Sequence, residues 1–155
     1  MKRLIHILAA GGLVVSLASL AAPAHADNLK FGIRGGYYTK VEQPFAGVEL
    51  LARVGHRVFF NPNVEYVFVD NGNYTTWNAD FHYDLPTHGS TYVWLGAGLA
   101  IVRLDPEGPD NSNNDAAANF LAGLGFRGGS VIPYFQAKVI AKDNTEFALA
   151  FGLRF

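Results

Sequence analysis

The sequence EFALAFGLRF, residues 146–155, is the best guide to the fold of this chain. Apolar side chains stand at every second place in it, at Phe147, Leu149, Phe151, Leu153 and Phe155. Such an alternation is typical of a β-strand with one apolar face. Ordinary domains tend to end in a few loose polar residues. A chain that stops on an aromatic residue within a strand pattern therefore indicates that its last side chain is needed.

The first 26 residues have the three parts of a secretory signal peptide. Lys2 and Arg3 give a charged start, residues 4–20 form a mostly apolar run, and residues 24–26 read Ala-His-Ala, a small-residue cleavage site. A membrane anchor would also fit the apolar run, but the cleavage site favours removal. We therefore expect a cleaved signal peptide over residues 1–26 and one exported domain over residues 27–155.

Composition excludes several classes of function. Two of the 12 Lys and Arg residues lie in the expected signal peptide, which leaves 10 against 13 Asp and Glu and argues against nucleic-acid binding. The chain has no cysteine, so neither a disulfide framework nor a thiolate metal site can form. Half of the residues are hydrophobic, yet after residue 26 no apolar run reaches the roughly 18 residues of a membrane-spanning helix.

Eight alternating stretches, separated by turn residues, follow the expected signal peptide. Each is about ten residues long, which suits a tilted strand that crosses a bilayer. An open sheet edge in lipid would leave backbone groups unpaired. The pattern therefore predicts an all-β, eight-stranded antiparallel up-and-down transmembrane β-barrel. The expected strands cover residues 29–38, 45–54, 58–69, 74–85, 91–104, 118–127, 131–141 and 146–155.

Proline placement follows from the same barrel. Each strand is paired on both sides, so a proline inside a strand deletes a ladder hydrogen bond. We expect Pro44, Pro62, Pro86 and Pro133 at or near strand ends.

The two faces of each expected strand differ in composition. One face carries the bulky apolar residues, and the other carries nearly every charge together with the small residues. An eight-stranded barrel is only just wide enough inside for side chains, so the bulky face is expected to meet lipid. The charges then line the lumen and nearly balance, which predicts a plug of ion pairs instead of a pore. The expected lumen charge network is Arg34, Glu49, Arg53, Glu65, Asp80, His82, Asp84, Arg127, Lys138, Glu146 and Arg154.

One stretch departs from this division. In residues 91–104, Tyr92 and Trp94 share the parity of Gly96 and Gly98, so both faces are apolar.

With a periplasmic amino terminus, the short turns at 55–57, 86–90 and 128–130 lie on the periplasmic side, and the long polar loop 105–116 lies outside.

The terminal strand resembles the carboxy-terminal signature that the barrel-assembly machinery recognises in outer-membrane proteins. Residues 27–155 resemble the small eight-stranded outer-membrane barrels, the opacity-protein-like and OmpX/OmpA-like group. The resemblance implies an outer-membrane monomer that meets outer-membrane lipids and lipopolysaccharide, with Phe147, Phe151 and Phe155 as the assembly signal. Because only loop 105–116 could reach far from the membrane, a dedicated host-receptor function is not expected.

Three stretches are candidates for chemistry. Asp80, His82 and Asp84 alternate onto one face and could bind a metal or form a carboxylate-oriented base, but pairing with lumen Arg and Lys side chains is favoured. His88 and Ser90 resemble the H-x-S spacing of lipid A deacylase barrels, yet the turn that holds them is expected to be periplasmic. The acidic stretch 105–116 could attract calcium, but it lacks the glycine at the sixth place and the glutamate at the twelfth place of an EF-hand loop, so a hydrated loop is favoured.

No catalytic residue, metal or cofactor is therefore predicted. The expected function is a non-enzymatic outer-membrane barrel with a plugged polar lumen, which contributes to envelope structure or surface interactions. Two alternatives stay open. One is a lipid-modifying enzyme built on the same barrel, and the other is a soluble periplasmic barrel that binds an apolar ligand.

Overall fold

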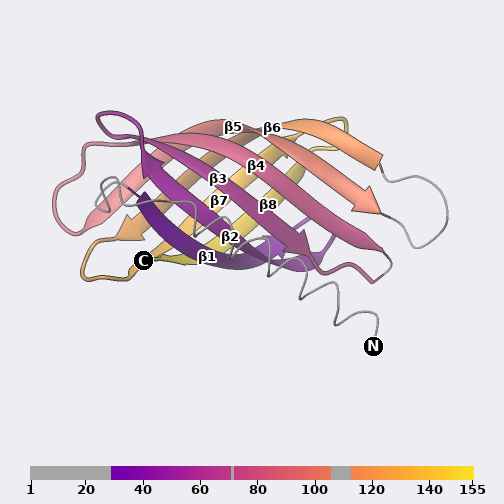
Figure 1. Cartoon of the computed structure of the whole chain (residues 1–155), viewed down its shortest axis with the longest axis horizontal. Coiled ribbons are helices and arrows are strands. Elements are labelled where there is room, and N and C mark those ends of the chain that lie inside the picture. Colours follow the sequence, from indigo (N-terminus) through magenta and orange to yellow (C-terminus); the bar gives the residue numbers. More distant parts are fainter. Residues whose placement is uncertain (1–28, 71, 106–112) are drawn as a thin grey trace.

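The computed structural model describes residues 29–70, 72–105 and 113–155. The expected signal peptide and most of loop 105–116 lie outside these residues. The described residues form a closed antiparallel barrel in which each strand pairs with its neighbour in the chain and the last returns to the first (Figure 1). They contain no helix, and so none long and apolar enough to cross a membrane. The strands are β1 (Leu29–Tyr38), β2 (Gln43–Arg53), β3 (Val58–Val67), β4 (Asn73–Asp84), β5 (Thr91–Asp105), β6 (Asn113–Phe126), β7 (Ile132–Ala141) and β8 (Glu146–Arg154).

The predicted fold class and the predicted order of eight strands are confirmed. The largest difference in boundaries is at β6, which begins at Asn113 instead of residue 118. Its first residues pair with the end of β5, for example Asn114 with Arg103 and Asp115 with Val102. Backbone pairing does not require apolar side chains, and β5 is itself held on its other side by β4, where Asn73 pairs with Asp105. The prediction that β6 begins at residue 118 is therefore wrong, because it treated the polar residues before that point as loop.

Pro62 lies in the middle of β3, so its expected place near a strand end is wrong. The ladder between β2 and β3 runs to the Glu49–Asn63 pair and resumes at Ala52–Phe60, with the pairs opposite Pro62 missing. The side-chain amide of Asn61 donates a hydrogen bond of 2.6 Å to the carbonyl oxygen of Leu50, directly across from Pro62. A side-chain donor thus replaces the N–H that proline lacks.

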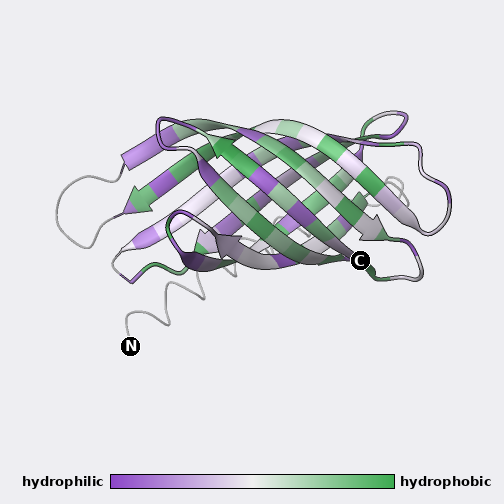
Figure 2. Cartoon of the chain, turned by 180° about the vertical axis from the view of Figure 1, so that it is seen from behind, coloured by the Kyte–Doolittle hydropathy of each residue, from purple (hydrophilic) through white to green (hydrophobic). Residues whose placement is uncertain are grey.

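The outer surface of the barrel is apolar, as the parity of the strands predicts. Large side chains such as Leu99, Trp77 and Phe120 are 70%, 50% and 56% exposed, whereas the alternate positions are buried inside. Figure 2 shows the resulting alternation of hydrophobic and hydrophilic residues along the strands. A bulky apolar surface around a polar interior is the arrangement of a membrane-spanning barrel.

The barrel has two ends that differ in their connections. The terminal end holds the start of β1, the end of β8 and the turns at 54–57, 85–90 and 127–131. The loop end holds the other connections, including the one between β5 and β6. An apolar cluster lies in the lumen near the loop end, and its members include Tyr38, Phe45, Val67, Tyr74 and Ile140. A second cluster, formed by Tyr92, Trp94, Leu121 and Tyr134, lies in the half nearer the terminal end.

Candidate functional site: the charges of the lumen

A chain of five charged side chains crosses the lumen between these two clusters. Arg154 Nε lies 2.7 Å from Glu49 Oε1, and Arg34 Nη1 lies 3.3 Å from Glu49 Oε2. Arg34 also binds Glu65, and Lys138 Nζ lies 2.6 Å from Glu65 Oε2. Lys138 is on β7 and Glu65 on β3, which stand opposite each other in the strand order. The ion pairs therefore join one wall of the barrel to the other.

Neutral groups complete the coordination of the two glutamates. Glu65, which is fully buried, also accepts hydrogen bonds from the hydroxyls of Tyr38 and Thr76, the latter at 3.1 Å. Glu49 accepts one from the amide of Asn61 at 3.1 Å. Buried carboxylates are stable only when paired and hydrogen-bonded. The five-residue chain meets both conditions.

Asp80 balances the charge of this chain without touching it. Three cations face two glutamates in the chain, so one further negative charge makes the set neutral. Asp80 is fully buried and accepts hydrogen bonds from the amides of Asn63 at 3.0 Å and Asn119 at 2.8 Å. Within the described residues no Arg or Lys nitrogen lies within 4.0 Å of it. The expected direct pairing of Asp80 with a lumen cation is therefore wrong, because amide groups take that place.

Asp80, His82 and Asp84 do not converge on one point. Residues two apart on a strand face lie about 7 Å apart, too far for three short side chains to share an ion. The ring of His82 instead lies between those of Phe59 and Trp94, with both centroids 5.3 Å away, and its Nε2 lies 3.6 Å from Asp84 Oδ1. Across the described part of the chain, no group of three His, Asp or Glu side chains could hold a metal ion.

Three other residues of the expected network lie away from the chain of ion pairs. Arg53 and Arg127 are at the mouth of the terminal end, where Arg127 Nη2 lies 2.8 Å from Asp84 Oδ2 and Arg53 Nε donates to a turn carbonyl. Glu146 lies at the loop end and accepts a hydrogen bond of 2.7 Å from the backbone N–H of Lys40. Parity predicts the face of a residue correctly here, but not its depth in the barrel.

The sequence reasoning missed the aromatic layer inside the lumen. Tyr92, Trp94 and Tyr134 are buried there, and the guanidinium of Arg154 lies 4.1 Å from the ring centre of Tyr134. Glycine makes room for these rings: a Cβ at Gly123 would lie 2.2 Å from Trp94. The signal was the shared parity of the aromatic residues and the strand glycines, which indicates one tightly filled interior.

The remaining candidates lie on the surface. His88 and Ser90 are exposed in the turn between β4 and β5, at the terminal end. Phe147, Phe151 and Phe155 point outwards from the last strand segment and are 54%, 45% and 50% exposed. The backbone N–H of Phe155 donates to the carbonyl of Phe31 at 2.8 Å, so the last residue takes part in closing the barrel.

Comparison with solved structures gives the same fold. The N-terminal β-barrel domain of Pseudomonas aeruginosa OprF matches with a TM-score of 0.69 and 16% identity, over 83% of this chain and 96% of that one. Neisserial surface protein A matches with a TM-score of 0.66 and 15% identity, over 84% of this chain and 98% of that one. The outer membrane enzyme PagL matches with a TM-score of 0.54 and 11% identity, over 81% of this chain and 98% of that one. No protein-family model and no curated protein sequence matches the chain. The chain therefore has the fold of the small eight-stranded outer-membrane barrels.

Proposed function

We propose that this chain is a non-enzymatic integral outer-membrane barrel whose lumen is closed by ion pairs, and that it contributes to envelope structure or surface interactions. The observation that carries the proposal is the chain of ion pairs from Arg154 to Lys138, which joins opposite strands across the lumen. Apolar and aromatic side chains fill the lumen on either side of it. Such an interior supports the barrel and leaves no continuous path for water.

The exterior supports a place in the outer membrane. Its apolar side chains suit contact with lipid tails, and lipopolysaccharide is the expected neighbour at the loop end. We further propose that residues 1–26 are removed on export, that the barrel is monomeric, and that the barrel-assembly machinery recognises the last strand through Phe147, Phe151 and Phe155. The outward, exposed position of these three rings leaves them accessible to a partner during insertion.

Electrophoresis of outer-membrane fractions tests this proposal. Folded membrane barrels resist unfolding by cold detergent, so the heated and unheated proteins should migrate differently. Deleting Phe155 should remove the heat-modifiable band from the membrane fraction, whereas Phe120→Ala, which trims an equally exposed ring in the wall of the barrel, should keep it. A heat-insensitive protein in the soluble periplasm would contradict the proposal and favour a soluble ligand-binding barrel.

A lipid-modifying enzyme is the second candidate, because the outer membrane enzyme PagL shares the fold. The candidate pair His88 and Ser90 is exposed at the terminal end, which we expect to face the periplasm. If the chain acts on lipopolysaccharide, overexpression should alter the mass profile of this lipid, and His88→Ala or His82→Ala should abolish the change. A profile that is the same with and without the protein would remove this candidate.

A further inference from the structure

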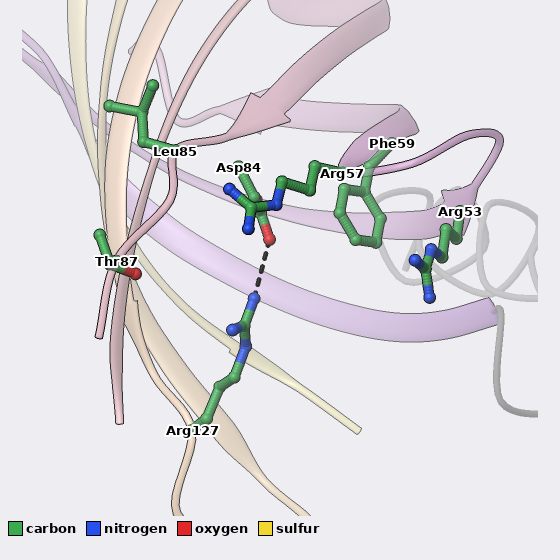
Figure 3. Close-up of a pocket in the computed structure, with 7 residues that line it drawn as sticks. All are labelled: Arg53, Arg57, Phe59, Asp84, Leu85, Thr87 and Arg127. Carbon is green, nitrogen blue, oxygen red and sulfur yellow. Dashed lines mark hydrogen bonds and ion pairs between the residues drawn. The ribbon is translucent and has the colours of Figure 1, made fainter. Parts of the chain in front are cut away.

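The terminal end of the barrel opens into a cavity that none of the five residues of the ion-pair chain lines. Its volume is about 300 Å³, and it is lined by Arg53, Arg57, Arg127, Asp84, Phe59 and Leu85, with Thr87 at its edge. Figure 3 shows the ion pair between Arg127 and Asp84, with the side chain of Arg57 extending toward Asp84 and that of Arg53 beyond the ring of Phe59. The residues come from β2, β3, β4 and the segments that connect the strands at this end.

Positive charge is in excess in this cavity. The one carboxylate that lines it is that of Asp84, and Arg127 Nη2 lies 2.8 Å from Asp84 Oδ2. The backbone N–H of Asp84 donates a hydrogen bond of 2.9 Å to the carbonyl oxygen of Arg57. Within the described residues, no carboxylate lies within 4.0 Å of the guanidinium of Arg53 or Arg57. Three cations against one anion leave two positive charges, whereas the charges deeper in the lumen cancel.

The backbone at Arg57 supports a role for its side chain. Arg57 has a φ of 62°, in the left-handed region, within a turn that the bond from Val58 N to Gly55 O closes. Glycine or asparagine fits this conformation with less strain. A strained residue is a reason to look for a function of its side chain. Here that side chain points into the cavity.

We propose that this mouth cavity binds a phosphate monoester, either as a soluble compound or as a lipid headgroup. A phosphate monoester carries close to two negative charges at neutral pH, which matches the excess, whereas a single carboxylate carries one. A guanidinium group binds phosphate bidentately, through two parallel N–H···O hydrogen bonds. Phe59 and Leu85 provide an apolar wall for the organic part of the ester, and the volume suits a small ligand.

Calorimetry on the mature protein, purified from outer membranes in detergent, tests the site with phenyl phosphate as the probe. We expect binding of one equivalent, and a loss in affinity of about tenfold or more for Arg53→Gln and for Arg57→Gln, because each removes a charged hydrogen bond. Asp84→Asn should instead tighten binding, since it removes the one negative charge. Arg103→Gln is the matched control: it deletes an exposed arginine near the loop end, paired with Asp105 at 2.9 Å. Heat-modifiable migration checks that every variant is folded.

The outcomes separate the sources of the phosphate. Binding of phenyl phosphate without enrichment of phosphatidic acid around the barrel in mixed lipid discs supports a soluble ester. Enrichment that phenyl phosphate reverses supports a lipid headgroup. The proposal is overturned if phenyl phosphate does not bind, if benzoate binds as tightly, or if Arg103→Gln weakens binding as much as Arg57→Gln.

Discussion

Replacing Glu65 by Gln should destabilise the barrel strongly, although it changes the shape of the side chain little. Glu65 is fully buried and accepts hydrogen bonds from Arg34, Tyr38, Thr76 and Lys138. Arg34 keeps Glu49 as a partner, but Glu65 is the one carboxylate within 4.0 Å of Lys138 in the described structure. Glu65→Gln thus leaves an ammonium group uncompensated in the lumen.

The size of the effect follows from the burial of the pair. Breaking a buried ion pair by removing one partner costs about 3–5 kcal/mol. The control Arg103→Gln breaks the pair with Asp105, whose side chains are 52% and 34% exposed, and pairs of this kind contribute about 0–1 kcal/mol. The free energy of unfolding is measured by urea titration of the protein in lipid vesicles, with migration on gels as the readout of folding.

A second substitution tests the cause. If the loss arises from the unpaired ammonium group, the addition of Lys138→Met to Glu65→Gln should recover part of the stability, with a coupling of at least about 1 kcal/mol. Two results would show that the unpaired ammonium group is not the cause: a loss for Glu65→Gln no larger than that for Arg103→Gln, or a double variant whose loss is the sum of the losses of Glu65→Gln and Lys138→Met.

Three further predictions follow from the packing and the ends of the chain. Gly123→Val should cost about 1–3 kcal/mol by overpacking against Trp94, as the same urea titration would show, whereas a cost below that of an exposed substitution would contradict the contact. Asn61→Leu should cost about 1–3 kcal/mol because the carbonyl of Leu50 loses the donor that replaces the proline N–H, and a stable variant would mean that another donor serves it. Deletion of Phe155 should lower the amount of folded barrel in the outer membrane, measured by heat-modifiable migration, and unchanged amounts would exclude it from the assembly signal.

The fold could be predicted because a barrel in lipid has few alternatives. A period of two over eight short stretches gives strands, and the width of the barrel decides which face is inside. The expected first strand, near residues 29–38, agrees with β1 because the apolar alternation ends where the strand ends, at Tyr38. Where the alternation and the strand do not coincide, as in the Asn- and Asp-rich start of β6, the boundary is wrong, since the backbone ladder continues under polar side chains.

The lumen could be predicted only in part. Parity identifies the inward face, but the depth of each residue depends on the tilt and stagger of the strands, which a list of alternating residues does not contain. Parity therefore assigns Arg53, Glu146 and Glu65 to the same inward face, although Arg53 and Glu146 lie near opposite ends of the barrel. The amide partners of Asp80 and the place of Pro62 also depend on which residues face each other across strands, and that pairing appears only in the folded structure.

Single-channel recording in planar lipid bilayers tests the closed lumen most directly. If the proposed plug closes the lumen, the purified barrel should insert and produce no stepwise current, because ion pairs and packed side chains lie in the lumen between Tyr38 and Trp94. Heat-modifiable migration of the same protein, reconstituted in vesicles of the same lipid, would verify that it folds and inserts. Steps of the size that porins give, from protein verified in this way, would contradict the central claim.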